Sequence, residues 1–136
     1  MPKMIFVNLP VKDLAAATRF YEAIGAVKNP QFSDDNASSM AWSDEIVFML
    51  LKHDYYKTFT AKPIGDAHKA SAMLIALSQE SREGVDAITE AAKKAGGKID
   101  LRPAQDLGFM YGRTFEDLDG NMFEPMFMDM SAMPSE

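Results

Sequence analysis

The sequence predicts an α+β protein built from duplicated βαβββ modules. Segments with strand and helix periodicity follow one another in the order β-α-β-β-β, and the same order returns after an irregular polar stretch over residues 53–69. A doubly wound sheet would need strict alternation of strands and helices, so a mixed sheet is expected. The predicted organisation is a first module at 1–60, a linker at 61–69, a second module at 70–130 and a frayed tail at 131–136.

The first module begins with a short strand, MIFVNLPV, over residues 4–11. Asp13 suits a helix N-cap, apolar residues then recur at helical spacing, and Gly25 suits the end of that helix. Three short strands are expected to follow, at 26–32, 38–42 and 45–51.

The second module repeats this order. A strand is expected over 71–77, and Ser81 can cap a helix that ends at Gly96-Gly97. The last three strands are expected at 98–102, 109–116 and 122–128. The sequence DLDGN, between the last two, supplies residues that tolerate turn conformations.

Composition excludes several classes of protein. Acidic residues outnumber basic ones by 20 to 14, which argues against binding to nucleic acid. The absence of cysteine excludes disulfides, thiolate metal sites and cysteine nucleophiles. No signal-peptide pattern or apolar run of membrane length is present, so we expect a cytoplasmic protein without a membrane partner.

Glu124 is the main candidate for chemistry, because it lies in an apolar segment where a charge needs a partner. It can be a pocket carboxylate that binds a ligand donor or acts as a general base. It can instead be held by a backbone amide or an arginine, for which Arg113 on the neighbouring strand is a candidate. In a third interpretation, Pro125 breaks the strand and turns Glu124 to solvent.

Three segments, taken in order, resemble one known family: IFVNLPVKDLAAATRFYEAIGA, REGVDAITEAAKKAGGK and GRTFEDLDGNMFEPMFMD. With the element order, the chain resembles the vicinal oxygen chelate superfamily, which includes glyoxalases, bleomycin-resistance proteins, extradiol dioxygenases and fosfomycin-resistance enzymes. The segments IFVNLPVKDL and GFMYGRTFEDLDG are most similar to a bacterial glyoxalase-like subgroup whose members are mostly uncharacterised. The resemblance implies paired βαβββ modules that form a curved mixed sheet around a cleft, and a homodimer.

The resemblance also implies four metal-ligand positions, which in metal-dependent members carry His, Glu or Gln. Here the position on the first strand is Phe6, which cannot coordinate a metal. The position on the last strand of the first module falls near Met49 or Leu51, and that on the first strand of the second module near Met73. Only the fourth position, Glu124, carries a ligand.

Two neighbouring side chains could supplement Glu124. Asn8 points to the same face as Phe6 and offers a weak oxygen, and His53 continues the face of Met49 if that strand runs on. Even with His53 the set falls short of the roughly three protein ligands of a catalytic zinc site. We therefore expect no metal or other cofactor, with a divalent metal as the alternative.

Two functions follow from the resemblance. The first is metal-independent binding of a small amphipathic molecule in a Met- and aromatic-lined cleft, as in bleomycin-resistance proteins. The alternative is a glyoxalase-like enzyme, such as a lactoylglutathione lyase, with Glu124 as base or sole metal ligand. For any single Met or aromatic side chain, plain core packing is the competing interpretation. The candidate ligand-binding residues are Phe6, Asn8, Trp42, Met49, His53, Met73, Tyr111, Arg113, Met122 and Met126.

Overall fold

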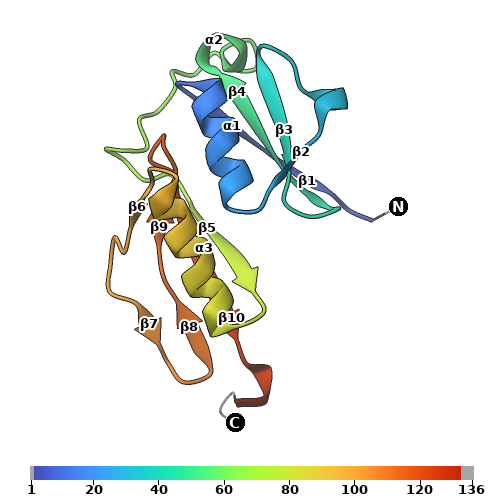
Figure 1. Ribbon diagram of the computed structural model, residues 1–136. Coiled ribbons are helices and arrows are strands. Elements are labelled where there is room, and N and C mark those ends of the chain that lie inside the picture. The colour runs from blue at the N-terminus through green and yellow to red at the C-terminus, as the bar shows by residue number, and fades with distance from the viewer. Residues whose placement is uncertain (1, 133–136) are drawn as a thin grey trace. The chain divides into compact units, whose positions relative to one another are not determined.

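The computed structural model describes residues 2–132 and divides the chain into two compact units, with the boundary between Asp66 and Ala67. Each unit holds one mixed sheet with a single long helix packed on it (Figure 1). The predicted α+β class and the repeated βαβββ order are confirmed. Each unit is described separately below.

The first unit contains a four-stranded sheet in the order β1-β4-β3-β2, with β1 parallel to β4 and the other pairs antiparallel. Its elements are β1 (Ile5–Val11), α1 (Leu14–Ala23), β2 (Val27–Lys28), the 3-10 turn η1 (Pro30–Phe32), β3 (Ala37–Ala41), β4 (Ile46–Lys52) and the short helix α2 (His53–Tyr56).

Alternation along β1 and β4 gives this sheet a buried face toward α1. Leu9 is paired in register with Leu50, and the two side chains are 1% and 0% exposed. On the same face the Tyr21 ring of α1 packs against Phe48 of β4, with centroids 5.7 Å apart. Helix α1 begins where the Asp13 carboxylate accepts a hydrogen bond from the Ala16 amide. We call the opposite side of each sheet, turned away from the long helix, its open face.

The second unit is organised around β10. This strand pairs in parallel with β5 along one side, and antiparallel with β8 and β9 along the other. Two short strands extend the sheet, since β6 pairs with β9 and β7 with β8. The elements are β5 (Leu74–Gln79), α3 (Arg82–Lys94), β6 (Lys98–Ile99), β7 (Gln105–Asp106), β8 (Met110–Gly112), β9 (Phe115–Glu116), β10 (Met122–Met128) and the 3-10 turn η2 (Met130–Ala132).

Helix α3 covers the buried face of this second sheet. The Ser81 hydroxyl caps its first turn by accepting a hydrogen bond from the Gly84 amide at 2.9 Å. Val85 on the helix is fully buried, as are Phe115 and Phe123 on the sheet. The two phenylalanine rings stack with their centroids 5.2 Å apart, so the core of this unit lies between α3 and β10.

Several predicted boundaries were wrong. The strand expected over 26–32 ends at Lys28, because Pro30 has no amide for a ladder and begins a 3-10 turn capped by Asn29. The strand expected over 98–102 ends at Ile99, because Asp100 adopts a φ of +54° and turns the chain. Short elements at 53–56 and 105–106 were not predicted.

The strand expected over 109–116 is interrupted between β8 and β9, and Pro125 explains the gap. The Arg113 amide donates to the Pro125 carbonyl at 3.1 Å, but proline has no N–H with which to return that bond. At the gap Thr114 forms hydrogen bonds with the residues that follow β6. Its carbonyl oxygen accepts a hydrogen bond from the Asp100 amide, and its hydroxyl oxygen accepts one from the Leu101 amide. Thr114, at the break in the strand, thus holds the start of the 100–104 loop in place.

The end of the chain lies partly outside the described residues. Of the predicted tail at 131–136, residues 133–136 are not described, and the residues before them form η2. Within residues 2–132, none of the helices has the length and apolar character needed to cross a membrane. The cytoplasmic location stays a prediction.

Candidate functional site

Glu124 lies on the open face of the second unit. It is the third residue of β10, between the fully buried Phe123 and the buried Pro125, so alternation turns its side chain away from α3. In register it faces Ala76 of β5. The carboxylate accepts a hydrogen bond from Nη2 of Arg102 at 3.2 Å, and the Glu124 side chain keeps 24% of its exposure. Glu124 is therefore an ion-paired residue at a sheet surface.

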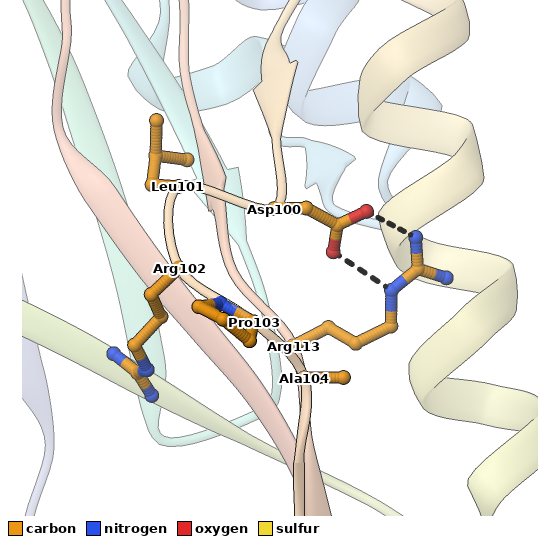
Figure 2. Close-up of a pocket in the computed structure, with 6 residues that line it drawn as sticks. All are labelled: Asp100, Leu101, Arg102, Pro103, Ala104 and Arg113. Atoms are coloured by element: carbon orange, nitrogen blue, oxygen red, sulfur yellow. Dashed lines mark hydrogen bonds and ion pairs between the residues drawn. The ribbon is translucent and has the colours of Figure 1, made fainter.

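The predicted pairing of Glu124 with Arg113 is wrong. Arg113 bonds to Pro125 across the sheet, one residue out of register with Glu124, so its side chain points to the helix face. There its Nε and Nη2 donate to the Asp100 carboxylate at 3.1 and 2.9 Å, as Figure 2 shows. Its Nη1 donates to Asp86 at 3.0 Å. These hydrogen bonds, that to Asp100 foremost, raise the pKa of Arg113 above its ordinary value.

Tyr111 belongs to the same network on the helix face. Its hydroxyl donates to the Asp86 carboxylate at 2.7 Å, and the Arg82 guanidinium lies 5.1 Å from the centre of its ring. This hydrogen bond is the main cause that lowers the pKa of Asp86 and raises the pKa of Tyr111. Tyr111 and Arg113 therefore fasten α3 to its sheet and do not share the face of Glu124.

Arg102, the partner of Glu124, was missed by sequence reasoning. It lies in the 100–104 loop, where Asp100–Ala104 and Arg113 line a hollow of about 610 Å³. In Figure 2 the Arg102 and Arg113 side chains extend away from each other. Nε of Arg102 is buried without a hydrogen-bond partner, which costs about 1–3 kcal/mol for a donor removed from water. Nothing in LRPAQ signals this role, because it depends on the gap that Pro125 creates.

In the first unit, three of the predicted residues share the open face. Asn8 is paired in register with Met49, and Phe6 lies two residues earlier on the same side of β1. Phe6 is 54% exposed. Trp42 does not join them: its ring packs edge-on against Phe48 in the core beneath α1, with centroids 6.5 Å apart. Trp42 thus lies on the helix face of its sheet, where it is partly buried.

Two further predicted positions are displaced. Strand β4 ends at Lys52 and His53 begins α2, so the histidine does not extend the face of Met49. Met73 lies one residue before β5 begins. The β5 residues on the Glu124 face are Leu74, opposite Met122, Ala76, opposite Glu124, and Ser78, opposite Met126. Met122 and Met126 do share that face with Glu124.

The residues at these positions do not fit the metal site that the resemblance implies for metal-dependent members. Phe6, Met49 and Leu74 have no oxygen or nitrogen side-chain donor for a hard divalent cation, and Glu124 is already engaged by Arg102. Within residues 2–132 there is no group of three or more His, Cys, Asp or Glu side chains that could hold a metal ion.

The two units place their central residues at equivalent positions. Asn8 and Ala76 each lie five residues before the N-cap of the following helix, Asp13 and Ser81 respectively. Across the parallel pair, Asn8 faces Met49 and Ala76 faces Glu124. Met49 and Glu124 are therefore counterparts, and only the second unit carries a charge there.

Comparisons with known proteins give a family match and a shared fold. The family model for the Glyoxalase/Bleomycin resistance protein/Dioxygenase superfamily matches residues 3–124. No curated protein matches the chain.

Solved structures share the fold at low sequence identity. A hypothetical protein from S. aureus is 23% identical with a TM-score of 0.78, covering 93% of this chain and 94% of its own. A glyoxalase-related enzyme from Fulvimarina pelagi is 21% identical with a TM-score of 0.77, covering 93% and 88%. A genomically encoded fosfomycin resistance protein from Listeria monocytogenes is 21% identical with a TM-score of 0.68, covering 96% and 97%.

Proposed function

Because the chain belongs to the glyoxalase/bleomycin resistance protein/dioxygenase superfamily, we propose that it binds a small amphipathic molecule on its open sheet faces, without a metal. One observation carries this proposal: the open faces present apolar side chains where a metal site would need donors. Phe6 and Leu74 are each 54% exposed there, in positions equivalent in the two units. Because each is already about half buried, covering one of them with a ligand contributes roughly half of the 1.5–3 kcal/mol of a complete side-chain burial.

Metal content tests the first part of the proposal. Protein purified without chelator and analysed for Ni, Zn, Mn and Fe by inductively coupled plasma mass spectrometry should contain far less than one equivalent of each. Stoichiometric metal that disappears in Glu124→Ala would overturn the proposal and favour an enzyme that uses Glu124 as a metal ligand.

Binding of a neutral apolar probe tests the second part. We expect N-phenyl-1-naphthylamine to bind with enhanced fluorescence, and Phe6→Gln or Leu74→Gln to weaken that binding about tenfold, because each removes apolar contact area. Phe32→Gln is the matched control, since Phe32 is 64% exposed in the 3-10 turn η1 and lies outside both sheets. Equal probe affinity in all three variants would contradict the assignment to the open faces.

We also propose that the protein is a homodimer. Two long strands lie at sheet edges: among the described residues, β1 pairs only with β4 and β5 only with β10. Ile5 at the start of β1 is 55% exposed. An unpaired strand edge with exposed apolar side chains favours association with another chain.

A further inference from the structure

The Arg102–Glu124 pair suggests which polar group the ligand carries. Resting on the proposed function, we propose that the pair binds a neutral group with adjacent acceptor and donor atoms, of which a primary carboxamide is the simplest. The amide carbonyl would accept from Arg102, and the amide N–H would donate to Glu124.

The first argument is that this ion pair is incompletely bonded, in contrast to two others in the same unit. Arg82 donates Nη1 and Nη2 to the two oxygens of Asp106, both at 2.9 Å. Arg113 likewise uses two nitrogens on the two oxygens of Asp100. Such two-bond forks are a frequent geometry of arginine–carboxylate pairs, and they use both carboxylate oxygens.

Arg102 makes only one such bond, from Nη2 to Oε2 of Glu124 at 3.2 Å. Among the described residues, Nη1 of Arg102 and Oε1 of Glu124 form no hydrogen bond, and Nε is buried without a partner. The pair therefore keeps unused donor capacity on the Arg102 guanidinium and an unused acceptor on the Glu124 carboxylate. A planar group with an acceptor next to a donor satisfies both at once.

The second argument concerns charge. A ligand anion at Arg102 would lie beside the Glu124 carboxylate, and a ligand cation at Glu124 would lie beside the Arg102 guanidinium. Either arrangement brings like charges together on a partly dehydrated surface, since the two side chains are 31% and 24% exposed. The net charge of −6 further disfavours anions. A neutral group avoids both costs.

The third argument is the surface around the pair. Ala76 faces Glu124 on the neighbouring strand, and Met122 and Met126 lie two residues to either side of it on the same face. Methionine adapts its shape to varied apolar partners. A molecule with an apolar body and one carboxamide therefore matches the polar pair and the apolar surface around it.

Four amphiphiles with the same ten-carbon chain test the inference. Decanamide, methyl decanoate, decanoate and decylammonium are each tested for displacement of N-phenyl-1-naphthylamine from the purified full chain at neutral pH, below the solubility limits of the two neutral molecules and the micelle concentrations of the two ions. We expect decanamide to bind about tenfold more tightly than methyl decanoate, which accepts but cannot donate, and more tightly than either ion.

Two variants assign this preference to the pair. Glu124→Gln is nearly isosteric, and it should reduce the preference for decanamide over decanoate by at least about tenfold, because the charged acceptor is lost. Arg102→Lys keeps the charge but loses the planar donors, and it should reduce the preference for decanamide over decylammonium. Arg82→Lys, at a complete fork on the helix face, is the matched control and should leave all four affinities unchanged. Circular dichroism checks that each variant is folded.

The outcomes separate this inference from the proposed function. Equal affinity for decanamide and methyl decanoate, or tightest binding of decanoate, would overturn the inference and leave apolar binding intact. A preference that survives both Arg102→Lys and Glu124→Gln would overturn the assignment to this pair. If the probe binds but none of the four molecules displaces it, the inference is overturned and the proposed function stands; if the probe itself does not bind, the proposed function is overturned.

Discussion

Gly120, in the DLDGN turn, cannot be replaced without moving the backbone. Its φ is +91°, and a Cβ atom there would lie 2.5 Å from the His68 amide nitrogen and 2.8 Å from the Ala67 carbonyl carbon. Both the left-handed conformation and the close approach of the 67–68 segment require glycine. From the sequence, Asp119-Gly120 predicted only a turn, because nothing in the turn itself shows which distant segment will pack on it.

We expect Gly120→Ala to lower the free energy of unfolding by at least about 1–3 kcal/mol, since it combines an unfavourable φ with a backbone clash. Chemical denaturation followed by circular dichroism would measure the change. Gly65→Ala is the control, because no atom lies within 4 Å of a Cβ there, and its effect should be close to zero or slightly stabilising. Equal effects of the two substitutions would contradict this explanation.

The hydrogen bond between Tyr111 and Asp86 gives a pH-dependent prediction. The Tyr111 hydroxyl, with Arg113, lowers the pKa of Asp86 below its ordinary value of 3.8, although burial acts in the opposite direction. A carboxyl with a depressed pKa in the folded state stabilises the fold above the unfolded pKa, and this contribution is lost as the pH falls through the folded pKa.

Tyr111→Phe should therefore raise the Asp86 pKa toward 3.8, as measured by carbon-13 NMR titration of the side-chain carboxyl. The difference in unfolding free energy between wild type and variant should be largest above pH 4 and should shrink as the pH falls below about 3.8. A difference in stability that is independent of pH would mean that the hydroxyl acts through packing alone.

At Glu124, part of the site could be predicted from sequence and part could not. The Glu124 side chain points to the face opposite that of Phe123 and Pro125, and this follows from the period-two alternation of β-strands. Its partner depends on the register across the DLDGN turn, and a shift of one residue exchanges the two faces. Thr114, and not Arg113, is the residue that shares its face. Arg102 comes from a loop whose position only the folded structure defines.

At the scale of elements, helices and long strands were predictable because their apolar periodicity is strong. Strand β10 has the predicted bounds, and α3 begins after the predicted N-cap Ser81. The exceptions are local: Pro30 and Asp100 end strands early, and Pro125 interrupts a strand that lies beside its own. The last effect acts between segments distant in sequence, so a pattern within one segment does not reveal it.

The stacked pair Phe115–Phe123 should be the main anchor of α3 on its sheet. Phe123→Ala would remove a fully buried ring, and we expect a loss of about 3–5 kcal/mol in the free energy of unfolding. Phe32→Ala, at a ring that is 64% exposed in η1, should cost less than about 1 kcal/mol. Differential scanning calorimetry compares the two, and similar melting temperatures for both variants would contradict the assigned role.

At the scale of the whole molecule, the resemblance to the glyoxalase superfamily is confirmed by the match over residues 3–124. This establishes the family and its repeated fold, while the ligand and the presence of a metal stay proposals because they depend on individual side chains. The fold could be predicted from the sequence because three motifs in the right order indicate it. The ligand could not, because it depends on the side chain at each individual position.

The proposed homodimer predicts a sedimenting mass of twice 15.1 kDa at micromolar concentration. Ile5→Lys should shift the population toward monomer, because a lysine on an edge strand disfavours pairing with another strand. Val27→Lys, on the two-residue edge strand β2, should leave the mass unchanged. A wild-type protein that sediments as a monomer throughout would overturn the proposal.

The correspondence between Met49 and Glu124 has a practical consequence for protein engineering. Because both residues lie on the last strand of their unit, facing Asn8 and Ala76 in the same register, each unit supplies a template for altering the other. Met49→Glu would place on the first unit a carboxylate at the position equivalent to Glu124 of the second. Combined with Asn8→His, it would bring an imidazole and a carboxylate together on adjacent parallel strands. These two substitutions would supply two metal ligands on one sheet face, and adding a third would give the number that a catalytic zinc site needs.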